Sequence, residues 1–420
     1  MNPLAGQLPG GPPMRSVAEQ LERVLAIAVT PPPVRTAISE AQGLLCAEEV
    51  VASSALPAFD QAAVDGYAVR SVDVAIAAEG HPVVLPVVGE IEAGARTPHR
   101  LQPNQTVHVA TGAALPTLAD AVVPRSHTQG GGARVSVIKP VESGSYVRRT
   151  GEDVQPGDVA VRLGAFIGAA QVGLLAAVGR DKVLVHPRPR LSIISVGDEL
   201  VDVARTPGPG QVYDVNSFAL AAAARDAGAD ATRIGIAPSD PRRLRELVEA
   251  RLLVSEVVLI SGAAGGRSAE LVVEALADLG TLDLTRVAMQ PGSAQGFGLL
   301  GTDRVPTFLL PANPVSALVV FEVVVRPLIR IMLGRANPYR RTVMARCLEP
   351  ITSPPGRRQF LRGQLMRDDE DEYLVHVLGG SGTHLLASLA EANCLVLVDE
   401  ETTAVPVGHE VPVSFLAQRA

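Results

Sequence analysis

The stretch VVLISGAAGGRSAELVVEALADLG, residues 257–280, decides the fold class of the chain. Its first residues form an apolar, β-branched run that is typical of a buried strand, and a turn of small residues follows. The last part has apolar residues at helical spacing and ends at a glycine. A strand, a glycine-rich turn and a helix in this order are typical of turns that bind phosphate or another anion. This turn, however, contains no lysine and no Lys-Ser or Lys-Thr pair.

The same alternation extends over residues 188–335. We expect strands in LSIISVG (191–197), EVVLISG (256–262), LTRVAMQPG (284–292) and VPTFLLPANP (305–314), and helices in residues 217–228, 242–253 and 315–333. Asn216 is suited to cap the first of these helices, and Asp240, followed by Pro241, the second. Strands that alternate with helices predict a parallel α/β sheet.

The rest of the chain has a different character. Residues 1–13 are rich in Pro and Gly and are expected to be a disordered leader. Residues 15–56 are predicted to be helical with a break at Pro31–Pro33, and residues 168–179 to form a short helix. Residues 82–147 and 341–420 consist of short β-rich runs separated by Pro and Gly, so each predicts a small β domain.

Composition excludes several classes of protein. The 420 residues are 47 % hydrophobic and 19 % charged, with a net charge of -7 and no run of Lys or Arg, which argues against nucleic-acid binding. The three cysteines have neither metal-binding spacing nor a disulfide framework, which suits a reducing cytoplasm. The most apolar segment, residues 305–334, is interrupted by Pro, Glu and Arg, so we expect a buried strand and a buried helix instead of a membrane span.

Polar residues follow the predicted strands. Asp198 and Glu199 come after the first strand, Ser261 and Gly262 open the glycine-rich turn, and Asn313, Pro314 and Ser316 begin the last helix. The Pro-Gly turn at Gly292 is a fourth such place. Ligands of open α/β sheets bind at the carboxyl ends of the strands, and Mg²⁺ prefers carboxylate and phosphate oxygens. A cleft with two carboxylates, a hydroxyl and amide-rich turns predicts a phosphorylated or anionic ligand, with magnesium as a possible companion.

Each feature also has a structural interpretation. An Asp-Glu pair after a strand is often a turn or a helix cap, and Asn-Pro-Val-Ser can simply begin a helix. Glycine-rich turns often serve only close packing. Asp65 and the Glu152-Asp153 pair would pass as ordinary turn residues. The convergence of four strand ends on one sheet is what favours a functional site.

Six motifs in one order carry a family resemblance. They cover the chain from about residue 14 to its end and are AVDGYAVR (63–70), VATGAALPTLADAVV (109–123), VRRTGEDVQPGD (147–158), SVGDELV (195–201) with GQVYDVNS (210–217), LPANPVSA (310–317) and SLAEANCLVLV (388–398). Together they resemble the molybdopterin molybdenumtransferase family, which includes the gephyrin E domain.

The resemblance implies an elongated homodimer of multi-domain, α/β plus β subunits. The implied domains are a dimerisation domain (14–70 and 148–187), a small β domain (71–147), an α/β molybdopterin-binding-like domain (188–335) and a C-terminal β domain (340–420). The active site would lie between the α/β domain and the partner subunit's first two domains. The implied reaction inserts molybdate into adenylylated molybdopterin with Mg²⁺ and releases AMP.

Site residues follow from the resemblance motif by motif. Those implied to be catalytic are Asp65, Asp153, Asp198, Glu199 and Ser316. Asp198 and Glu199 would also be the metal ligands. Those implied to bind the cofactor are Thr111, Gly112, Gly197, Asp240, Ser261, Gly262, Gly292, Asn313 and Pro314.

The departures from the family pattern lie in the predicted cleft. The family's Ser-Gly-Gly-Val-Ser turn is SGAAG here, and its Lys-Pro-Gly-Lys-Pro is QPGSA, so Gln290 and Ser293 replace two lysines. Its Leu-Pro-Gly-Asn-Pro is LPANP. Lysines near molybdate and phosphate supply charge-assisted hydrogen bonds, and their loss should weaken anion binding. Arg148, Arg149 or Arg267 are candidates to replace them. Arg267 is the best of the three, since it lies within the altered turn, but its position favours a solvated residue at a helix start.

Two functions from different classes remain open. The first is a molybdopterin molybdenumtransferase, slow or with altered anion handling. The second is a gephyrin-like scaffold that has lost the chemistry and binds a short cytoplasmic peptide tail of a membrane receptor or of a tubulin-like cell-division protein. A third possibility is a protein that binds and carries molybdopterin without inserting the metal.

Overall fold

The computed structural model describes residues 14–95, 100–238, 240–379 and 385–416. The predicted leader, residues 1–13, lies outside this range. The chain forms two compact units, of which one is Val34–Val185 and the other contains the residues before and after it. The finer four-domain division stays a prediction.

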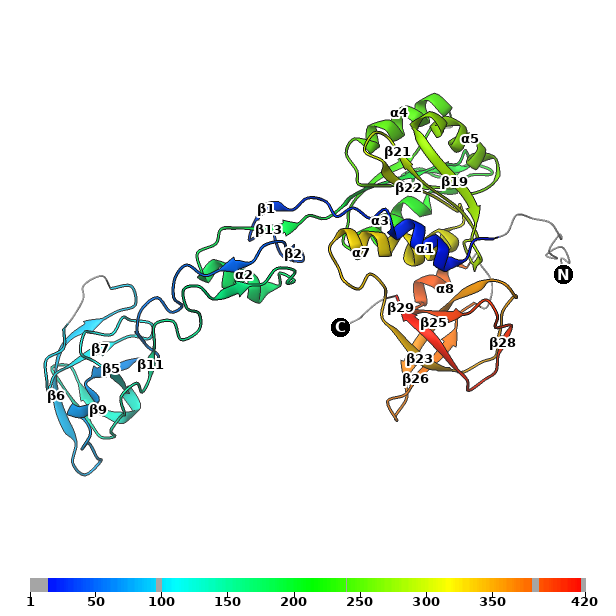
Figure 1. Ribbon diagram of the computed structural model, residues 1–420. Coiled ribbons are helices and arrows are strands. Elements are labelled where there is room, and N and C mark those ends of the chain that lie inside the picture. The colour runs from blue at the N-terminus through cyan, green and yellow to red at the C-terminus, as the bar shows by residue number, and fades with distance from the viewer. Residues whose placement is uncertain (1–13, 96–99, 239, 380–384, 417–420) are drawn as a thin grey trace. The chain divides into compact units, whose positions relative to one another are not determined.

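A six-stranded sheet with the order β17-β14-β18-β22-β21-β19 is the centre of the larger unit (Figure 1). Its strands are β14 (Arg190–Ser195), β17 (Asp230–Ile236), β18 (Val257–Ser261), β19 (Gly280–Arg286), β21 (Ala294–Leu300) and β22 (Val305–Leu310). The first four in this order are parallel, but β21 runs antiparallel to both of its neighbours. The prediction of a parallel sheet is therefore wrong in part, and the sheet is mixed. The two glycines within β21 hid this strand in the sequence, because glycine interrupts the side-chain pattern of a strand.

Helices cover both faces of this sheet (Figure 1). Their bounds are α3 (Val215–Ala227), α4 (Pro241–Leu252), α5 (Gly266–Leu276), α6 (Pro314–Val320), the π-helical turn η4 (Phe321–Val325) and α7 (Arg326–Met332), with a 3₁₀ turn η3 (Ala277–Leu279) after α5. α3, α6 and α7 share a core with one face, while α4 and α5 share a core with the other. The predicted pair of a buried strand and a buried helix, β22 and α6–α7, is confirmed. Within the described residues, no helix is long and apolar enough to span a membrane.

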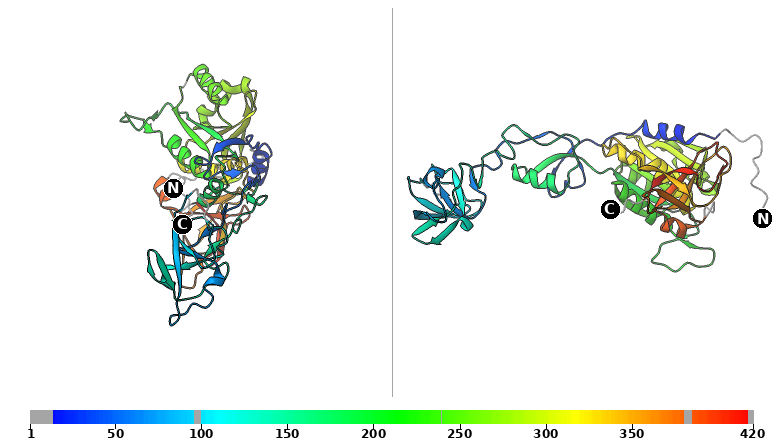
Figure 2. Two further views of the ribbon diagram at one scale, coloured as in Figure 1. Left: turned by 90° about the vertical axis from the view of Figure 1, so that its left-hand side faces the viewer. Right: turned by 90° about the horizontal axis from the view of Figure 1, so that it is seen from below.

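The helical prediction for residues 15–56 is wrong beyond its first turns. Only α1 (Val17–Leu25) is a helix, and it lies beside α7 in Figure 1 and in the right-hand view of Figure 2. The chain then continues as the short strands β1 (Val34–Ala37), β2 (Leu45–Cys46) and β3 (Val50–Val51). Three successive prolines remove backbone donors. The segment after them makes a few local turn hydrogen bonds, such as that from Glu40 to Ala37, and pairs its short strands with residues 158–185.

The C-terminal sheet closes on itself as a small barrel. Its order is β20-β25-β26-β23-β29-β27, and an additional pairing joins β25 to β27. The strands are β20 (Met289–Gln290), β23 (Thr342–Cys347), β25 (Arg358–Arg367), β26 (Tyr373–Val377), β27 (Cys394–Val398) and β29 (Glu410–Phe415), with the short pair β24 (Ile351–Thr352) and β28 (Ala404–Val405) and the helix α8 (Leu386–Glu391) beside them. The prediction of a small β domain here is confirmed.

The unit Val34–Val185 holds a second six-stranded sheet, with the order β8-β5-β7-β6-β10-β9. Its strands are β5 (Gly66–Val69), β6 (Val83–Ile91), β7 (Thr106–Val109), β8 (Ala121–Pro124), β9 (Thr128–Gly131) and β10 (Arg134–Val137), with the 3₁₀ turns η1 (Ser71–Asp73) and η2 (Arg125–His127). Smaller elements of the unit are β4 (Gln61–Ala62), β11 (Val147–Arg148), β12 (Val159–Val161), β13 (Lys182–His186) and the predicted short helix α2 (Ala169–Ala177).

Candidate functional site

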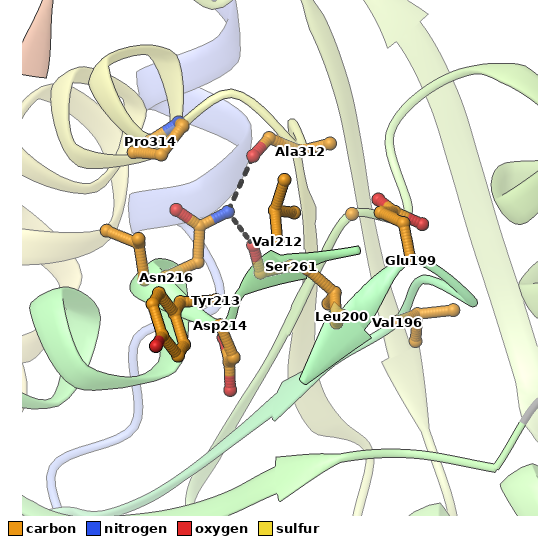
Figure 3. A pocket seen from close by; sticks show the side chains of 12 residues that line it. Val196, Glu199, Leu200, Val212, Tyr213, Asp214, Asn216, Ser261, Ala312 and Pro314 are labelled. Atoms are coloured by element: carbon orange, nitrogen blue, oxygen red, sulfur yellow. Dashed lines mark hydrogen bonds between the residues drawn. The ribbon is translucent and has the colours of Figure 1, made fainter. Parts of the chain in front are cut away.

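A cavity of about 270 Å³ lies at the carboxyl edge of the α/β sheet (Figure 3). The segments after β14, β18 and β22 and the start of α3 line it. The lining residues are Val196, Glu199, Leu200, Val212, Tyr213, Asp214, Val215, Asn216, Ser261, Gly262, Ala312 and Pro314. Two carboxylates contribute to this wall, and no lysine or arginine does so in the part of the chain that the structure describes.

Asp214 is a buried carboxylate that joins β14 to α3. It lies between β16 (Val212–Tyr213), which pairs with β15 (Leu200–Val201), and the first turn of α3. Its Oδ1 accepts a hydrogen bond of 2.7 Å from the hydroxyl of Ser195 and another from the backbone N–H of Ser217. The Ser217 hydroxyl donates to Oδ2. Asp214 is therefore the N-cap of α3, and the prediction that Asn216 has this role is wrong.

Asn216 connects the loops around the cavity. Its Nδ2 donates to the hydroxyl of Ser261 at 2.6 Å and to the carbonyl of Ala312 at 2.8 Å. The first partner ends β18 and the second follows β22, so one side chain on α3 ties two strand ends together (Figure 3). The side chain is buried, which makes these hydrogen bonds costly to break.

The glycine-rich turn after β18 uses its first amides internally. The N–H groups of Gly262 and Ala263 both donate to the carbonyl of Leu310, at 3.0 and 3.1 Å. These amides were expected to be exposed to a ligand, and that expectation is wrong. Gly262 itself has φ +85°, and a Cβ atom there would lie 2.1 Å from the carbonyl oxygen of Val196. The turn therefore packs closely against the neighbouring strand end.

Several predicted site residues of this unit line the cavity, and others do not. Glu199, Ser261, Gly262 and Pro314 lie in its wall. Gly197 and the exposed Asp198 directly precede Glu199 as a pair, but neither lines the cavity. Asp240 caps α4 by accepting from the N–H of Arg243, and Asn313 caps α6 by accepting from the N–H of Ser316. The structure gives these two caps a local role that the sequence also allowed.

The Pro-Gly turn at Gly292 does not follow a strand of the α/β sheet. β20, which precedes it, pairs with β25 of the C-terminal barrel and not with the α/β sheet. Gly292 packs against α6, where a Cβ atom would lie 2.4 Å from Val320 Cγ2. Ser293 donates its hydroxyl to the carbonyl of Val287. Three strand ends of the sheet, and not four, therefore converge on the cavity.

In the other unit, Asp65 and Thr111 are in contact. The N–H and the hydroxyl of Thr111 both donate to Asp65 Oδ1 at 2.7 Å. These two hydrogen bonds, together with attraction from Arg125, hold the pKa of Asp65 below its usual value. Gly112 follows with φ +82° and donates its N–H to the carbonyl of Ala62.

Asp153 lines a separate cavity of about 520 Å³ in this unit, together with Leu56, Pro57, Gln61, Arg148 and Glu152. A Cβ atom at Gly112 would lie 3.7 Å from Gln61 Oε1, so the Asp65–Thr111 contact and this cavity are near one another. Of the arginines considered as replacements for the lost lysines, Arg148 faces this cavity. Arg149 is paired with Asp60 at 2.7 Å, and Arg267 is exposed at the start of α5.

Profiles of known families match nearly the whole chain. Residues 15–179 match the MoeA N-terminal region (domain I and II), residues 192–331 a probable molybdopterin binding domain, and residues 344–416 the MoeA C-terminal region (domain IV). A curated relative from Mycobacterium tuberculosis, molybdopterin molybdenumtransferase 1, is 62 % identical over 96 % of this chain and 100 % of its own length. The chain belongs to the molybdopterin molybdenumtransferase family.

Other relatives of this molybdopterin molybdenumtransferase family member agree. Molybdopterin molybdenumtransferase 2 of Mycobacterium tuberculosis is 38 % identical over 95 % of this chain and 99 % of its own. The crystal structure of a molybdopterin biosynthesis MoeA protein from Pyrococcus horikosii has a TM-score of 0.78 at 32 % identity, covering 96 % of this chain and 100 % of that one. The multi-domain MoeA fold is thus shared over the full length.

Sequence reasoning missed three residues at the cavity of this family member. Tyr213, Asp214 and Asn216 lie within the motif GQVYDVNS, but none of them is among the predicted site residues. The signal was available, because Asp214 directly precedes the helix that follows the first strand of the sheet along the chain. The cavity combines a half-exposed aromatic ring, apolar walls and two carboxylates, which suits a heteroaromatic ring better than a bare anion.

Proposed function

We propose that this protein inserts molybdenum from molybdate into adenylylated molybdopterin and releases AMP, as a step of molybdenum cofactor biosynthesis. The observation that carries the proposal is the full-length identity of 62 % to a relative named for this transfer. The cavity at the carboxyl edge of the α/β sheet supports it, because this is where open α/β sheets bind their ligands. The relatives' names favour the enzyme over the scaffold, for which no specific observation speaks.

Within this proposal, the residues of the cavity have different roles that follow from their chemistry. The exposed ring of Tyr213 and the apolar Val196, Leu200 and Val212 suit a flat heterocycle such as a pterin or an adenine. Asp214 and Asn216 fix the loops that form the wall. Ser316 and Asn313 lie at the start of α6, next to the lining residue Pro314.

Magnesium fits the residues at the edge of the cavity. Glu199 in the cavity wall and the exposed Asp198 before it would hold the ion through carboxylate oxygens, and the ion would also bind phosphate oxygens of the ligand. Among the described residues, no three His, Cys, Asp or Glu side chains form a ready metal cluster. The metal would therefore arrive with the phosphorylated substrate, where it would neutralise phosphate charge. We further propose that the protein acts in the cytoplasm as a homodimer, in which Asp65, Thr111 and Asp153 of one subunit serve the reaction.

The direct test is release of AMP. Purified protein is mixed with adenylylated molybdopterin, molybdate and Mg²⁺, and AMP is measured by chromatography. Loss of the Glu199 charge in Glu199→Gln should slow release by about 100-fold, because metal-assisted charge stabilisation contributes several kcal/mol. Glu246→Gln, at an exposed position on α4, is the matched control and should not change the rate. No AMP from folded wild-type protein, under conditions where another family member turns over, would overturn the proposed function.

A further inference from the structure

Neighbouring strands of the unit Val34–Val185 bring several polar side chains to one edge of its sheet. Gly66 of β5 pairs with Val109 of β7 on one side and with Pro124 of β8 on the other. Asp65 precedes Gly66 and Arg125 follows Pro124, so the antiparallel register places these two residues opposite one another. On the far side of β7, Glu90 of β6 lies in register with His108.

The strands β5 and β8 approach each other closely at this end of the sheet. A Cβ atom at Gly66 would lie 2.2 Å from the carbonyl oxygen of Val123, so only glycine permits this pairing. Residues Gly66–Val69 are all buried. Side chains that flank this segment are therefore held by a backbone that cannot shift freely.

A chain of contacts connects Glu90, His108 and Arg125. His108 Nδ1 lies 2.9 Å from Glu90 Oε1, and His108 Nε2 lies 2.6 Å from Arg125 Nη2 and 3.2 Å from its Nε. A guanidinium only donates hydrogen bonds, so His108 Nε2 must accept. Nδ1 therefore carries the ring proton and donates a hydrogen bond to Glu90. The ring of Tyr67 packs edge-on against the imidazole at 5.4 Å between centroids, which further fixes its orientation.

The Nη1 side of the Arg125 guanidinium makes no part of the contact with His108. The contacts with His108 engage the Nε and Nη2 edge, whereas a guanidinium has five N–H donors in a planar fork. Asp65, next to it, has Oδ1 saturated by the two donors of Thr111. The edge thus presents a fixed cation and a fixed carboxylate side by side.

We propose that Arg125, positioned by His108, binds an oxyanion of the substrate, either a phosphate or molybdate. The inference rests on the proposed function. Cationic donors bind both oxyanions through charge-assisted hydrogen bonds, and the cavity of the α/β sheet has no basic residue in its described wall. Because the carboxylate of Asp65 would repel a bare anion, we expect binding to be strengthened by a divalent cation that accompanies the anion. His108 is a positioning residue, since it acts through Arg125.

The test is isothermal titration of the full chain with molybdate and, separately, with AMP, each with and without Mg²⁺. Arg125→Gln should weaken binding of at least one probe by about tenfold, the loss expected for one hydrogen bond to a charged group. Arg162→Gln is the matched control, since this exposed arginine of the same unit follows β12. Thermal melting monitored by circular dichroism checks that both variants fold.

Two substitutions at His108 separate positioning from packing. His108→Gln keeps an acceptor for Arg125 but loses the ring, and we expect its affinity to stay within about threefold of wild type. His108→Phe keeps the ring against Tyr67 but loses the acceptor, and it should resemble Arg125→Gln. The opposite order would show that only ring packing matters and would overturn the positioning role.

The remaining outcomes separate this inference from the proposed function. If wild-type protein binds neither probe, or if Arg125→Gln binds both as tightly as Arg162→Gln, the inference is wrong, whatever the AMP-release assay shows. If Arg125→Gln weakens the binding of a probe but the wild-type protein releases no AMP, the oxyanion site is supported and the proposed transferase function is wrong.

Discussion

The substitution Gly262→Ala tests whether the glycine-rich turn serves packing, as its internal hydrogen bonds indicate. The residue has φ +85°, a conformation that costs an L-residue about 1–2 kcal/mol. Its Cβ would lie 2.1 Å from the Val196 carbonyl oxygen, whereas Cβ atoms essentially never come closer than 3.0 Å, so this oxygen must retreat by at least 0.9 Å (3.0 − 2.1).

That retreat strains the hydrogen bonds around the turn. The N–H of Val196 donates to the carbonyl of Ser261 at 2.9 Å, and the N–H of Gly262 donates to Leu310 at 3.0 Å. Losing one of them costs about 1 kcal/mol. With the backbone strain, we expect Gly262→Ala to destabilise the α/β domain by about 2–3 kcal/mol.

Gly265→Ala is the matched control in the same turn. Its φ of 171° is ordinary extended backbone, and a Cβ atom there meets no other atom within 4 Å. Urea unfolding followed by circular dichroism measures stability, and hydrogen exchange of peptides covering residues 191–200 and 257–266 locates the change. Titration with AMP reports on the cavity. Gly262→Ala should unfold at lower urea and exchange faster in both peptides, and Gly265→Ala should match wild type. Equal stability of the two variants would refute the packing argument.

Two further substitutions test other contacts. Asn216→Asp replaces a donor by an acceptor opposite the Ala312 carbonyl. We therefore expect the free energy of unfolding to fall by about 2 kcal/mol and the affinity for AMP to decrease. Unchanged stability and affinity would show that this amide does not hold the loops. The pKa of Asp60 is lowered, most of all by the hydrogen bond from the N–H of Thr150 and next by the ion pair with an arginine. The carboxylate therefore stabilises the fold at pH values above its unfolded pKa, and this contribution is lost as the pH falls through the folded pKa. Asp60→Asn should therefore lower the urea midpoint at neutral pH, with a difference that disappears in acid; a constant difference would contradict the assignment.

The sequence predicted those parts of the fold that local patterns determine. The strand-turn-helix of residues 257–280 and the cap at Asp240 are present, because each depends on spacing and capping within a few residues. The strand β21 was not predicted, because its glycines have no side chains and so interrupt the alternation that indicates a strand. Residues after Pro33 were misassigned, since their partners lie more than a hundred positions away in the chain and no local pattern reveals them.

The candidate site was predictable only where a motif marks a strand end. Glu199 and Ser261 were found in this way and line the cavity. Asp214 was not, because Asn216 was predicted to be the cap of this helix in its place, and the buried hydrogen bond from Ser195 joins segments 19 positions apart. The Gly292 turn was assigned to the wrong sheet, since the two-residue strand before it pairs with the C-terminal barrel.

The loss of the family lysines has a consistent physical explanation. The turn after β18 donates its first amides to Leu310, and the cavity beside it is lined by carboxylates and apolar groups, so a bare dianion would find little attraction there. A cavity of this kind can still hold a heterocycle and a metal-bound phosphate. Molybdate would then need a cation from elsewhere in the protein, and Arg125 next to Asp65 is a fixed one. The altered turn is therefore compatible with catalysis, because the cavity beside it suits a heterocycle and a metal-bound phosphate.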